Sequence, residues 1–388
     1  IYMINRNIIM ILWISLFLAA CGQKGVSVAS DASYTIDMSQ LFEDAEETPD
    51  FKWNDLAERV DLVPLGKTER ILSNLSVQGL TDDGKVLLED MANGTITVAD
   101  IESGKIISSF NRVGRAGNEY LMPTFWGLIS ANIYDDKISF YSEGFNKRIQ
   151  VYDLYGRHLK SIDVKTDEYI CSCRVIDSNT FALTHVPLPS QDKPYVPKHF
   201  ITIINSEGEI IRTYLPSKFQ YAPSAIMTSS NNPFRYHDGV LVSSEHVGND
   251  TMYFVTKDRM YPFLITDFGE RGEKRRRQLT QPERPRLVSE DIYWPFYQGY
   301  YKDMLFSTLI YLGKRCTNIW QRDQLLAFKR GAFSCDLPRG GSIELSDYFV
   351  SGNKLIAPIE AFHLVGSVDG VTEDDNPFLV VITLKDNL

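Results

Sequence analysis

The chain has 388 residues, of which 44% are hydrophobic and 23% are charged, so it can supply a large core and is neither disordered nor fibrous. Its formal net charge is −10 at pH 7, and it becomes −11 without residues 1–20, which contain one basic and no acidic residue. Such a charge repels a phosphate backbone, and we expect no nucleic-acid partner.

Residues 1–20 have the features of a bacterial lipoprotein signal peptide. Arg6 precedes an apolar stretch, residues 8–20, that is too short to span a bilayer comfortably and ends in small residues. The sequence Leu18-Ala-Ala-Cys21 resembles the lipobox, in which the cysteine becomes the acylated first residue of the mature protein. We expect a lipid on Cys21 that anchors the chain to a membrane of the cell envelope, with the outer membrane preferred and the leaflet open. An ordinary secretory signal with an incidental cysteine is the alternative.

Residues 21–57 contain Ser-rich and acidic stretches without a periodic apolar pattern. We predict a tether with one short helix near residues 51–56, and a folded body over residues 58–388.

Within this body, a short apolar strand followed by an acidic or amide turn recurs six times. The turns lie at Asp100, Asp153, Asn205, Asp258, Asp323 and Asp386, at intervals of 53, 52, 53, 65 and 63 residues. In the first repeat the alternation of side chains predicts strands at 72–80, 86–89, 95–99 and 105–110. A repeat of this length made only of strands is typical of propeller blades. We therefore predict an all-β fold, a six-bladed β-propeller with four-stranded antiparallel blades.

The sixth repeat has no segment for its fourth strand. Residues 59–65 precede the first repeat and have strand character without a sheet of their own. We predict that this N-terminal strand completes the last blade and closes the ring, because closure satisfies two exposed backbone edges. Pro64 fits an outermost strand, where one edge can spare a donor.

The stretch Gly114-Arg-Ala-Gly-Asn-Glu-Tyr120 resembles the Gly-Arg-Gly-Pro-Gly-Glu-Tyr signature of six-bladed β-propeller lipoproteins of Gram-negative bacteria. Residues 60–65 and 249–269 also resemble this family, and the resemblance spans residues 58–388. The chain departs from the signature at residues 116–118. The family has NHL- or TolB-like blades and a mostly unassigned role, so the resemblance implies a fold and a binding role rather than a reaction.

Candidate ligand-binding residues follow the second strand of a blade or lie in the loops between blades. Both connections emerge on one face of a propeller, where binding sites usually lie. The candidates are Asp90, Arg115, Glu119, Tyr120, Glu143, His185, Glu245, His246 and Glu360. Such a ring could bind a cation, a sugar or a basic peptide, and a hydrated rim with local ion pairs is the alternative. For the signature loop, an Arg115–Glu119 pair that fastens two blades is a further alternative.

Two other segments have unusual composition. The aromatic run Tyr293–Tyr301 could stack on a sugar or a peptide, and packing between blades is the alternative. The basic residues within 271–277 could bind an anion, although we favour a solvated loop.

No catalytic residue, cofactor or metal site is predicted. The sequence lacks His-Glu-x-x-His, Gly-x-Ser-x-Gly and a phosphate-binding glycine loop, and its six histidines show no metal-ligand spacing. The cysteines after Cys21 are expected to be buried free thiols, with a Cys316–Cys335 disulfide left open.

We therefore expect a lipid-anchored binding or scaffolding module of the cell envelope. Its partner would be an envelope protein, a peptide or a glycan. A carbohydrate-active enzyme that uses carboxylates from several blades is the alternative, so the question of catalysis stays open with a non-enzymatic role favoured.

Substitution of Cys21 by Ser is expected to release the protein from the membrane fraction, because this thiol carries the acyl chains. Cell fractionation and immunoblotting measure the result, with Cys171→Ser as a control that should stay anchored. Unchanged anchoring of the Cys21 variant would contradict the lipid site.

Overall fold

The computed structural model describes residues 34–43, 45–68, 72–121, 129–142, 147–185, 197–216, 234–243, 251–280, 293–338 and 340–387. The chain divides into two compact units, residues 1–31 and 32–388, and every described residue belongs to the second unit. None of the helices in these ranges is long and apolar enough to cross a membrane. Cys21 lies outside the described residues.

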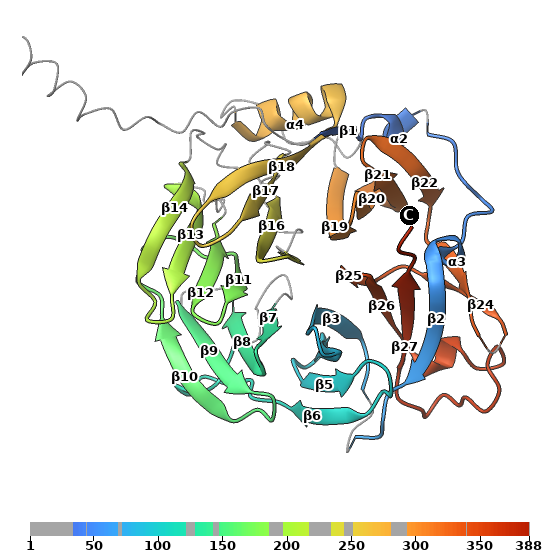
Figure 1. The fold of residues 1–388 in the computed structure, drawn as a ribbon, viewed down its shortest axis with the longest axis horizontal. Coiled ribbons are helices and arrows are strands. Elements are labelled where there is room, and N and C mark those ends of the chain that lie inside the picture. The colour runs from blue at the N-terminus through green and yellow to red at the C-terminus, as the bar shows by residue number, and fades with distance from the viewer. Residues whose placement is uncertain are drawn as a thin grey trace, which may run out of the picture. The chain divides into compact units, whose positions relative to one another are not determined.

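Six antiparallel sheets surround a central axis, and their strands follow the chain from the inside to the outside (Figure 1). Blade 1 contains β3 (Leu75–Leu80), β4 (Lys85–Asp90), β5 (Ile96–Asp100) and β6 (Ile106–Phe110). Blade 2 contains β7 (Ile129–Tyr134), β8 (Lys137–Ser142), β9 (Arg148–Asp153) and β10 (His158–Asp163). Blade 3 contains β11 (Ser172–Asp177), β12 (Thr180–Thr184), β13 (His199–Asn205) and β14 (Ile210–Pro216).

The second half of the ring repeats this order. Blade 4 contains β15 (Phe234–Tyr236), β16 (Gly239–Ser243), β17 (Thr251–Val255) and β18 (Met260–Asp267). Blade 5 contains β19 (Tyr293–Tyr301), β20 (Met304–Tyr311), β21 (Lys314–Gln321) and β22 (Gln324–Arg330). Blade 6 contains β25 (Phe349–Ser351), β26 (Lys354–Ile359), β27 (Phe378–Leu384) and, from the other end of the chain, β2 (Ala57–Pro64). The predicted six-bladed propeller is confirmed.

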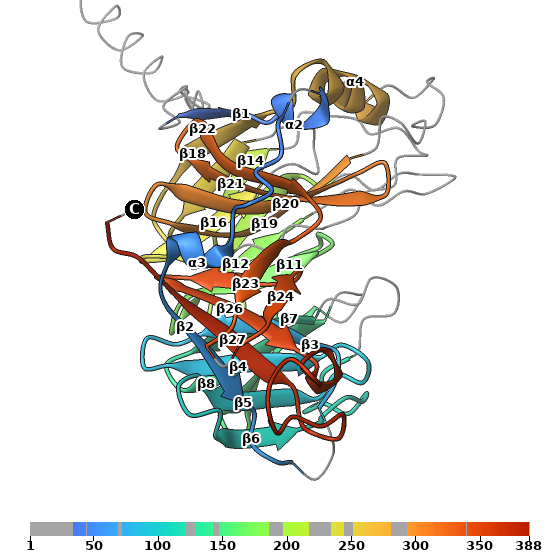
Figure 2. The ribbon, with the colours of Figure 1, turned by 90° about the vertical axis from the view of Figure 1, so that its right-hand side faces the viewer.

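The strand β2 closes the ring as predicted. It pairs antiparallel with β27, with Val60 opposite Ile382 and Leu62 opposite Val380, and the two strands lie side by side in Figure 2. The strand β2 also packs tightly against blade 1. A Cβ on Gly104 of blade 1 would lie only 1.9 Å from the carbonyl oxygen of Pro64. Gly104 also has φ +69°, which glycine adopts without steric cost, so both features require glycine in this turn.

The N-terminal segment begins to pack earlier than the sequence predicted. β1 (Thr35–Asp37) pairs parallel with β18 and adds a fifth strand to blade 4, and α2 (Gln40–Glu43) follows it. The ring of Phe42 lies 5.4 Å from that of Tyr293 and 4.8 Å from that of Tyr311 in blade 5. Thr48 then exchanges hydrogen bonds with the backbone of Phe328.

The short helix near residues 51–56 is present as α3 (Trp53–Leu56). Trp53 is fully buried between Phe306, Phe333 and Tyr348, and so joins blades 5 and 6. The structure therefore differs from the predicted tether over residues 34–57. The reason is that β1, α2 and α3 have only 3, 4 and 4 residues, so no apolar period runs far enough to reveal them.

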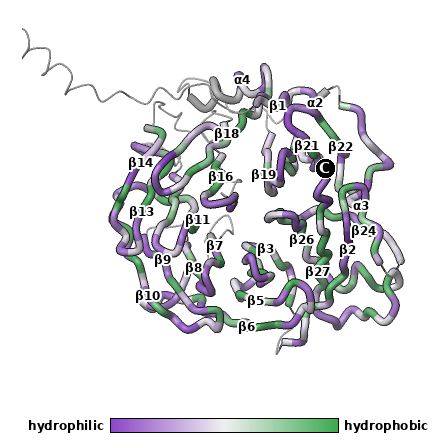
Figure 3. The backbone as a smooth tube through the Cα atoms, viewed as in Figure 1, coloured by the Kyte–Doolittle hydropathy of each residue, from purple (hydrophilic) through white to green (hydrophobic). Residues whose placement is uncertain are grey.

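Apolar clusters fill the spaces between neighbouring blades, and Figure 3 shows the hydrophobic residues along β27. A hairpin of β23 (Phe333–Asp336) and β24 (Ser342–Leu345) lies between blades 5 and 6 in the chain, and η3 (Ala361–His363) follows β26. Residues 271–277, for which we favoured a loop, belong to α4 (Gly269–Thr280). The four described cysteines are buried and free, so the Cys316–Cys335 disulfide is not formed.

The substitution Trp53→Ala is expected to lower the free energy of unfolding by about 3–5 kcal/mol, because it leaves a cavity in a packed core. Phe362→Ala is the control, since that ring is 56% exposed and its loss should change little. Thermal or urea unfolding measures both variants. Equal stabilities would show that α3 is not an integral part of the propeller.

Candidate functional site

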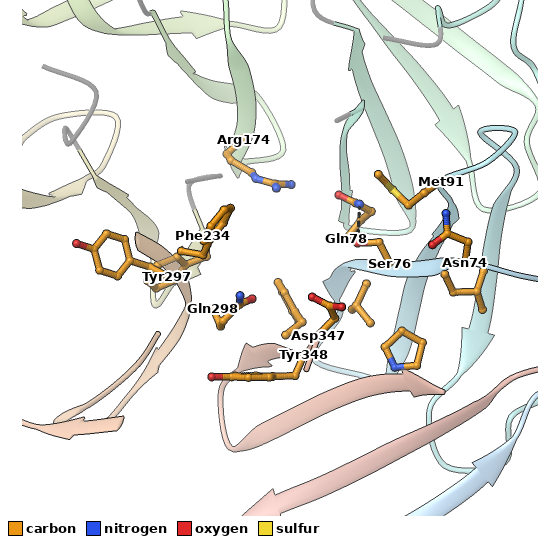
Figure 4. A pocket seen from close by; sticks show the side chains of 15 residues that line it. Asn74, Ser76, Gln78, Met91, Arg174, Phe234, Tyr297, Gln298, Asp347 and Tyr348 are labelled. Atoms are coloured by element: carbon orange, nitrogen blue, oxygen red, sulfur yellow. Dashed lines mark hydrogen bonds between the residues drawn. The ribbon is translucent and has the colours of Figure 1, made fainter. Parts of the chain in front are cut away.

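The inner strands of the blades surround a cavity of about 360 Å³ at one end of the central channel (Figure 4). It lies where these strands begin, and Asn74 and Met91 from two connections of blade 1 stand at its edge. This is the face on which the loops between blades and the connections from the second to the third strand emerge. The position therefore agrees with the face predicted from the sequence.

Beyond this cavity the channel narrows. The next hollow holds only about 40 Å³, and Arg174 and Phe234 line both spaces. In the narrow part, the guanidinium carbon of Arg235 lies 4.5 Å from the centre of the Tyr134 ring. The described lining thus leaves more space at the cavity than in the hollow next to it.

The two sides of the cavity differ in chemistry. Blades 1 and 3 contribute mostly polar side chains, among them Ser76, Gln78 and Arg174. Blades 4, 5 and 6 contribute aromatic residues, among them Phe234, Phe296 and Phe349, together with the polar Gln298 and Asp347. The pocket is therefore amphipathic.

The alternation of side chains along β19 explains how this strand contributes to the aromatic side of the cavity. Phe296 and Gln298 are half-buried, whereas Tyr293 and Tyr297 are buried on the other face of the strand. Successive side chains of a strand point to opposite faces, so the aromatic run serves the channel and the packing between blades at once. The hydroxyl of Tyr297 is bonded to that of Thr266 at 2.9 Å, which fixes the packed face.

Arg174 lines the cavity, and Glu89, another buried ionisable group, interacts with it electrostatically. Nη1 of Arg174 donates to the carbonyl oxygen of Ala131 at 2.7 Å and to Oδ1 of Asn132 at 3.3 Å, and burial lowers the pKa of Arg174 to about 10. Burial raises the pKa of Glu89 to about 8, although Arg174 opposes this effect. Oε2 of Glu89 has no hydrogen-bond partner among the described residues. Glu89 is therefore mainly an uncharged acid at neutral pH.

The signature loop fastens blade 1 to blade 2. The carbonyl oxygen of Gly117 accepts a hydrogen bond from Nε2 of Gln150 at 3.1 Å, and that of Asn118 accepts one from the hydroxyl of Tyr152 at 2.7 Å. The predicted fastening role is present, but backbone carbonyls perform it. No Arg115–Glu119 ion pair occurs in the described part of the chain, where Oε2 of Glu119 instead accepts from the N–H of Ala116 at 2.7 Å.

Tyr120, at the end of this loop, is a packing residue. Its ring stacks on Phe140 at 4.6 Å, and burial strongly raises the pKa of its hydroxyl. The hydroxyl donates to the carbonyl oxygen of Gly94 at 2.8 Å and accepts from the N–H of Arg112 at 3.2 Å. Tyr120 therefore ties the signature loop to a turn of its own blade.

Other predicted residues also hold local structure. Oδ1 of Asp90 accepts from the N–H of Ala92 at 2.9 Å, and Oδ2 accepts from Nδ2 of Asn93 at 2.8 Å, which forms a turn after β4. Oε1 of Glu360 accepts from the N–H of Asn74 at 2.5 Å and so joins blade 6 to blade 1.

His185 is a buried, neutral imidazole. Its Nδ1 donates to the carbonyl oxygen of Tyr169 at 2.8 Å, so Nε2 accepts from the hydroxyl of Thr202 at 2.8 Å. Burial lowers its pKa, in agreement with the neutral form. Nε2 lies 3.8 Å from Glu168, and no group of three or more described His, Cys, Asp or Glu residues is arranged to hold a metal ion.

The ligand-binding residues predicted from the sequence are therefore not the residues that line the cavity. Glu143, Glu245 and His246 lie outside the described residues. The described candidates Asp90, Arg115, Glu119, Tyr120, His185 and Glu360 do not line the cavity. The pattern that could have indicated the cavity is a pair of polar residues at alternate positions of an inner strand, such as Ser76 and Gln78.

A second hollow of about 470 Å³ lies outside the ring, beside β2 and the turn at residues 101–103. Several of its polar groups already have partners: Arg59 pairs with Asp61 at 2.7 Å, and Lys354 donates to Thr383 at 2.7 Å. We therefore regard the channel cavity as the candidate site.

A family model described as a domain of unknown function, DUF4934, matches residues 33–383. The chain belongs to the DUF4934 family. This membership and the fold confirm the predicted resemblance to six-bladed propellers of unassigned function.

Solved structures are similar to this DUF4934 chain at low sequence identity. A protein of Bacteroides fragilis NCTC 9343 that is described as exported is 13% identical, with a TM-score of 0.62 over 87% of this chain and 98% of that chain. A DUF4221 member from Bacteroides vulgatus ATCC 8482 is 11% identical, with a TM-score of 0.47 over 84% and 96% of the two chains. No curated protein matches the sequence.

The buried acid Glu89 predicts a pH-dependent stability. Its pKa is raised from 4.5 to about 8 on folding, so the folded state holds a proton that the unfolded state releases between these pH values. The wild type should lose on the order of a few kcal/mol relative to Glu89→Gln as the pH rises from about 4.5 to about 8. Thermal unfolding of both proteins at pH 5 and pH 9 measures this, and a difference that does not change with pH would contradict it.

Proposed function

We propose that this protein is an exported binding module of the cell envelope that holds its ligand in the cavity at the mouth of the central channel. One observation carries the proposal: inner strands from five blades converge on an amphipathic cavity of about 360 Å³. This volume lies within the usual range of ligand pockets, which combine apolar walls with a few placed polar groups.

Rigid support favours this site over the outer surface. The inner strands are hydrogen-bonded members of their sheets, so the lining side chains keep their positions without a ligand. The export signal at residues 1–20 and the description of the B. fragilis neighbour as exported support an extracytoplasmic location. The lipid on Cys21 and the outer membrane remain part of the proposal.

The alternative of a carbohydrate-active enzyme gains no support from the described lining. Glycoside hydrolysis ordinarily needs a pair of carboxyl groups on either side of the bond that is cleaved. Among the described residues that line the cavity, Asp347 is the acidic one, and its Oδ1 accepts from Nη1 of Arg315 at 2.9 Å.

The substitution Gln298→Trp should fill the cavity and weaken ligand binding roughly tenfold or more, because an indole would occupy the space between the two walls. Gln324→Trp is the matched control on the exposed start of β22. Immobilised glycan and peptide arrays serve as probes for the wild type and both variants. Wild-type protein that binds no probe, or a Gln298 variant that binds as tightly as the wild type, would contradict the proposal.

A further inference from the structure

The shape of the cavity restricts how a ligand enters. The described channel is wide at one end and narrows to a space of about 40 Å³, which Arg235 and Tyr134 help to constrict. A polymer that threads the channel would have to pass this narrower space, so the described lining suits the end of a chain or a small molecule better. The site therefore suits a terminal group that enters end-on.

The aromatic side of the cavity offers ring faces at neighbouring blades. Phe296 of β19 and Phe349 of β25 both line the cavity and are half-buried, so part of each ring remains accessible. Aromatic faces pack against flat apolar surfaces. A sugar ring has such a surface on the C–H side, and its hydroxyl groups project around the edge.

The opposite side offers neutral amides. Gln78 is 6% exposed, and its Nε2 donates a long hydrogen bond of 3.3 Å to the hydroxyl of Ser76. Asn74 adds a second amide at the edge, and Gln298 adds a third from β19 on the aromatic side. An amide donates and accepts hydrogen bonds, as does a hydroxyl group, so these side chains complement a polyol.

The backbone of Asn74 is held in place at the edge of the cavity. Its φ is 47°, in the left-handed region that asparagine adopts more often than most residues other than glycine. Its N–H donates to Oε1 of Glu360, and its carbonyl oxygen accepts from the N–H of Met91 at 3.1 Å. Both backbone groups are thus committed, which fixes the point from which the side chain projects.

The charged groups of the described lining already have protein partners. Arg174 donates to Ala131 and Asn132, and Asp347 accepts from Arg315. A peptide terminus carries a full charge and would need an opposite charge in the pocket. The neutral amides and aromatic faces favour a sugar over a peptide terminus.

We propose that the cavity binds the terminal sugar of a glycan end-on, with the ring against Phe296 and Phe349 and the hydroxyl groups on Asn74, Gln78 and Gln298. This inference rests on the proposed function, because it assigns a ligand class to the same cavity. It also predicts that the free terminal monosaccharide competes with the oligosaccharide.

Two variants test the two walls. Phe296→Ala removes the ring, and Asn74→Gly removes an amide while glycine keeps the positive φ without strain. Each should weaken binding of a soluble oligosaccharide, chosen from array hits, roughly tenfold or more in titration calorimetry. Phe362→Ala, at a ring 56% exposed on η3 and absent from the lining, should bind like the wild type.

The outcomes separate this inference from the proposed function. Oligosaccharide binding that is unchanged in both variants, or that the free monosaccharide does not compete for, overturns the terminal-sugar assignment. Binding of peptides alone, with sensitivity to Gln298→Trp, overturns the sugar but keeps the channel site. If the Gln298→Trp substitution weakens no binding of the wild-type protein, both the terminal-sugar assignment and the channel site are overturned. Melting temperatures of all variants show whether a loss of binding comes from unfolding.

Discussion

The antiparallel pairing of β2 with β27 is the interaction on which the rest of the structure depends. It joins two segments that are about three hundred residues apart, so loop closure opposes it and the gain of hydrogen bonds and apolar contacts must offset that cost. In return it covers the edge of blade 6 and fixes that blade against blade 1. The cavity exists only because closure sets the distances between inner strands of different blades.

The N-terminal segment extends this closure beyond one pair of strands. Before it reaches β2, it pairs with β18 of blade 4 through β1, contacts Phe328 of blade 5 and buries Trp53 between blades 5 and 6. The N-terminal segment thus contacts three blades rather than one.

The fold could be predicted from the sequence more fully than the site because its signals are local. Alternating apolar residues and the turns at Asp100, Asp153 and Asn205 repeat within each blade, and each repeat specifies its own sheet. The site depends on which polar atoms are already bonded. Asp90 and His185 lie at the ends of second strands as predicted, but their atoms satisfy nearby backbone and hydroxyl groups. The spacing of residues in the sequence cannot distinguish a polar residue that bonds to its own neighbours from one that is available to a ligand.

Ligand-binding residues on the inner strands should destabilise this fold less than the same residues on the middle strands. The middle strands β4 and β27 are buried almost throughout, and a polar residue there needs its own partner or becomes neutral, as Glu89 does. The strands β3 and β25 are less completely buried, because each is the innermost strand of its blade and has a free edge at the channel. Residues such as Ser76, Gln78 and Phe349 can therefore suit a ligand without disturbing the packing between blades. The same rigid ring can then present different ligand sites through changes in a few inner positions.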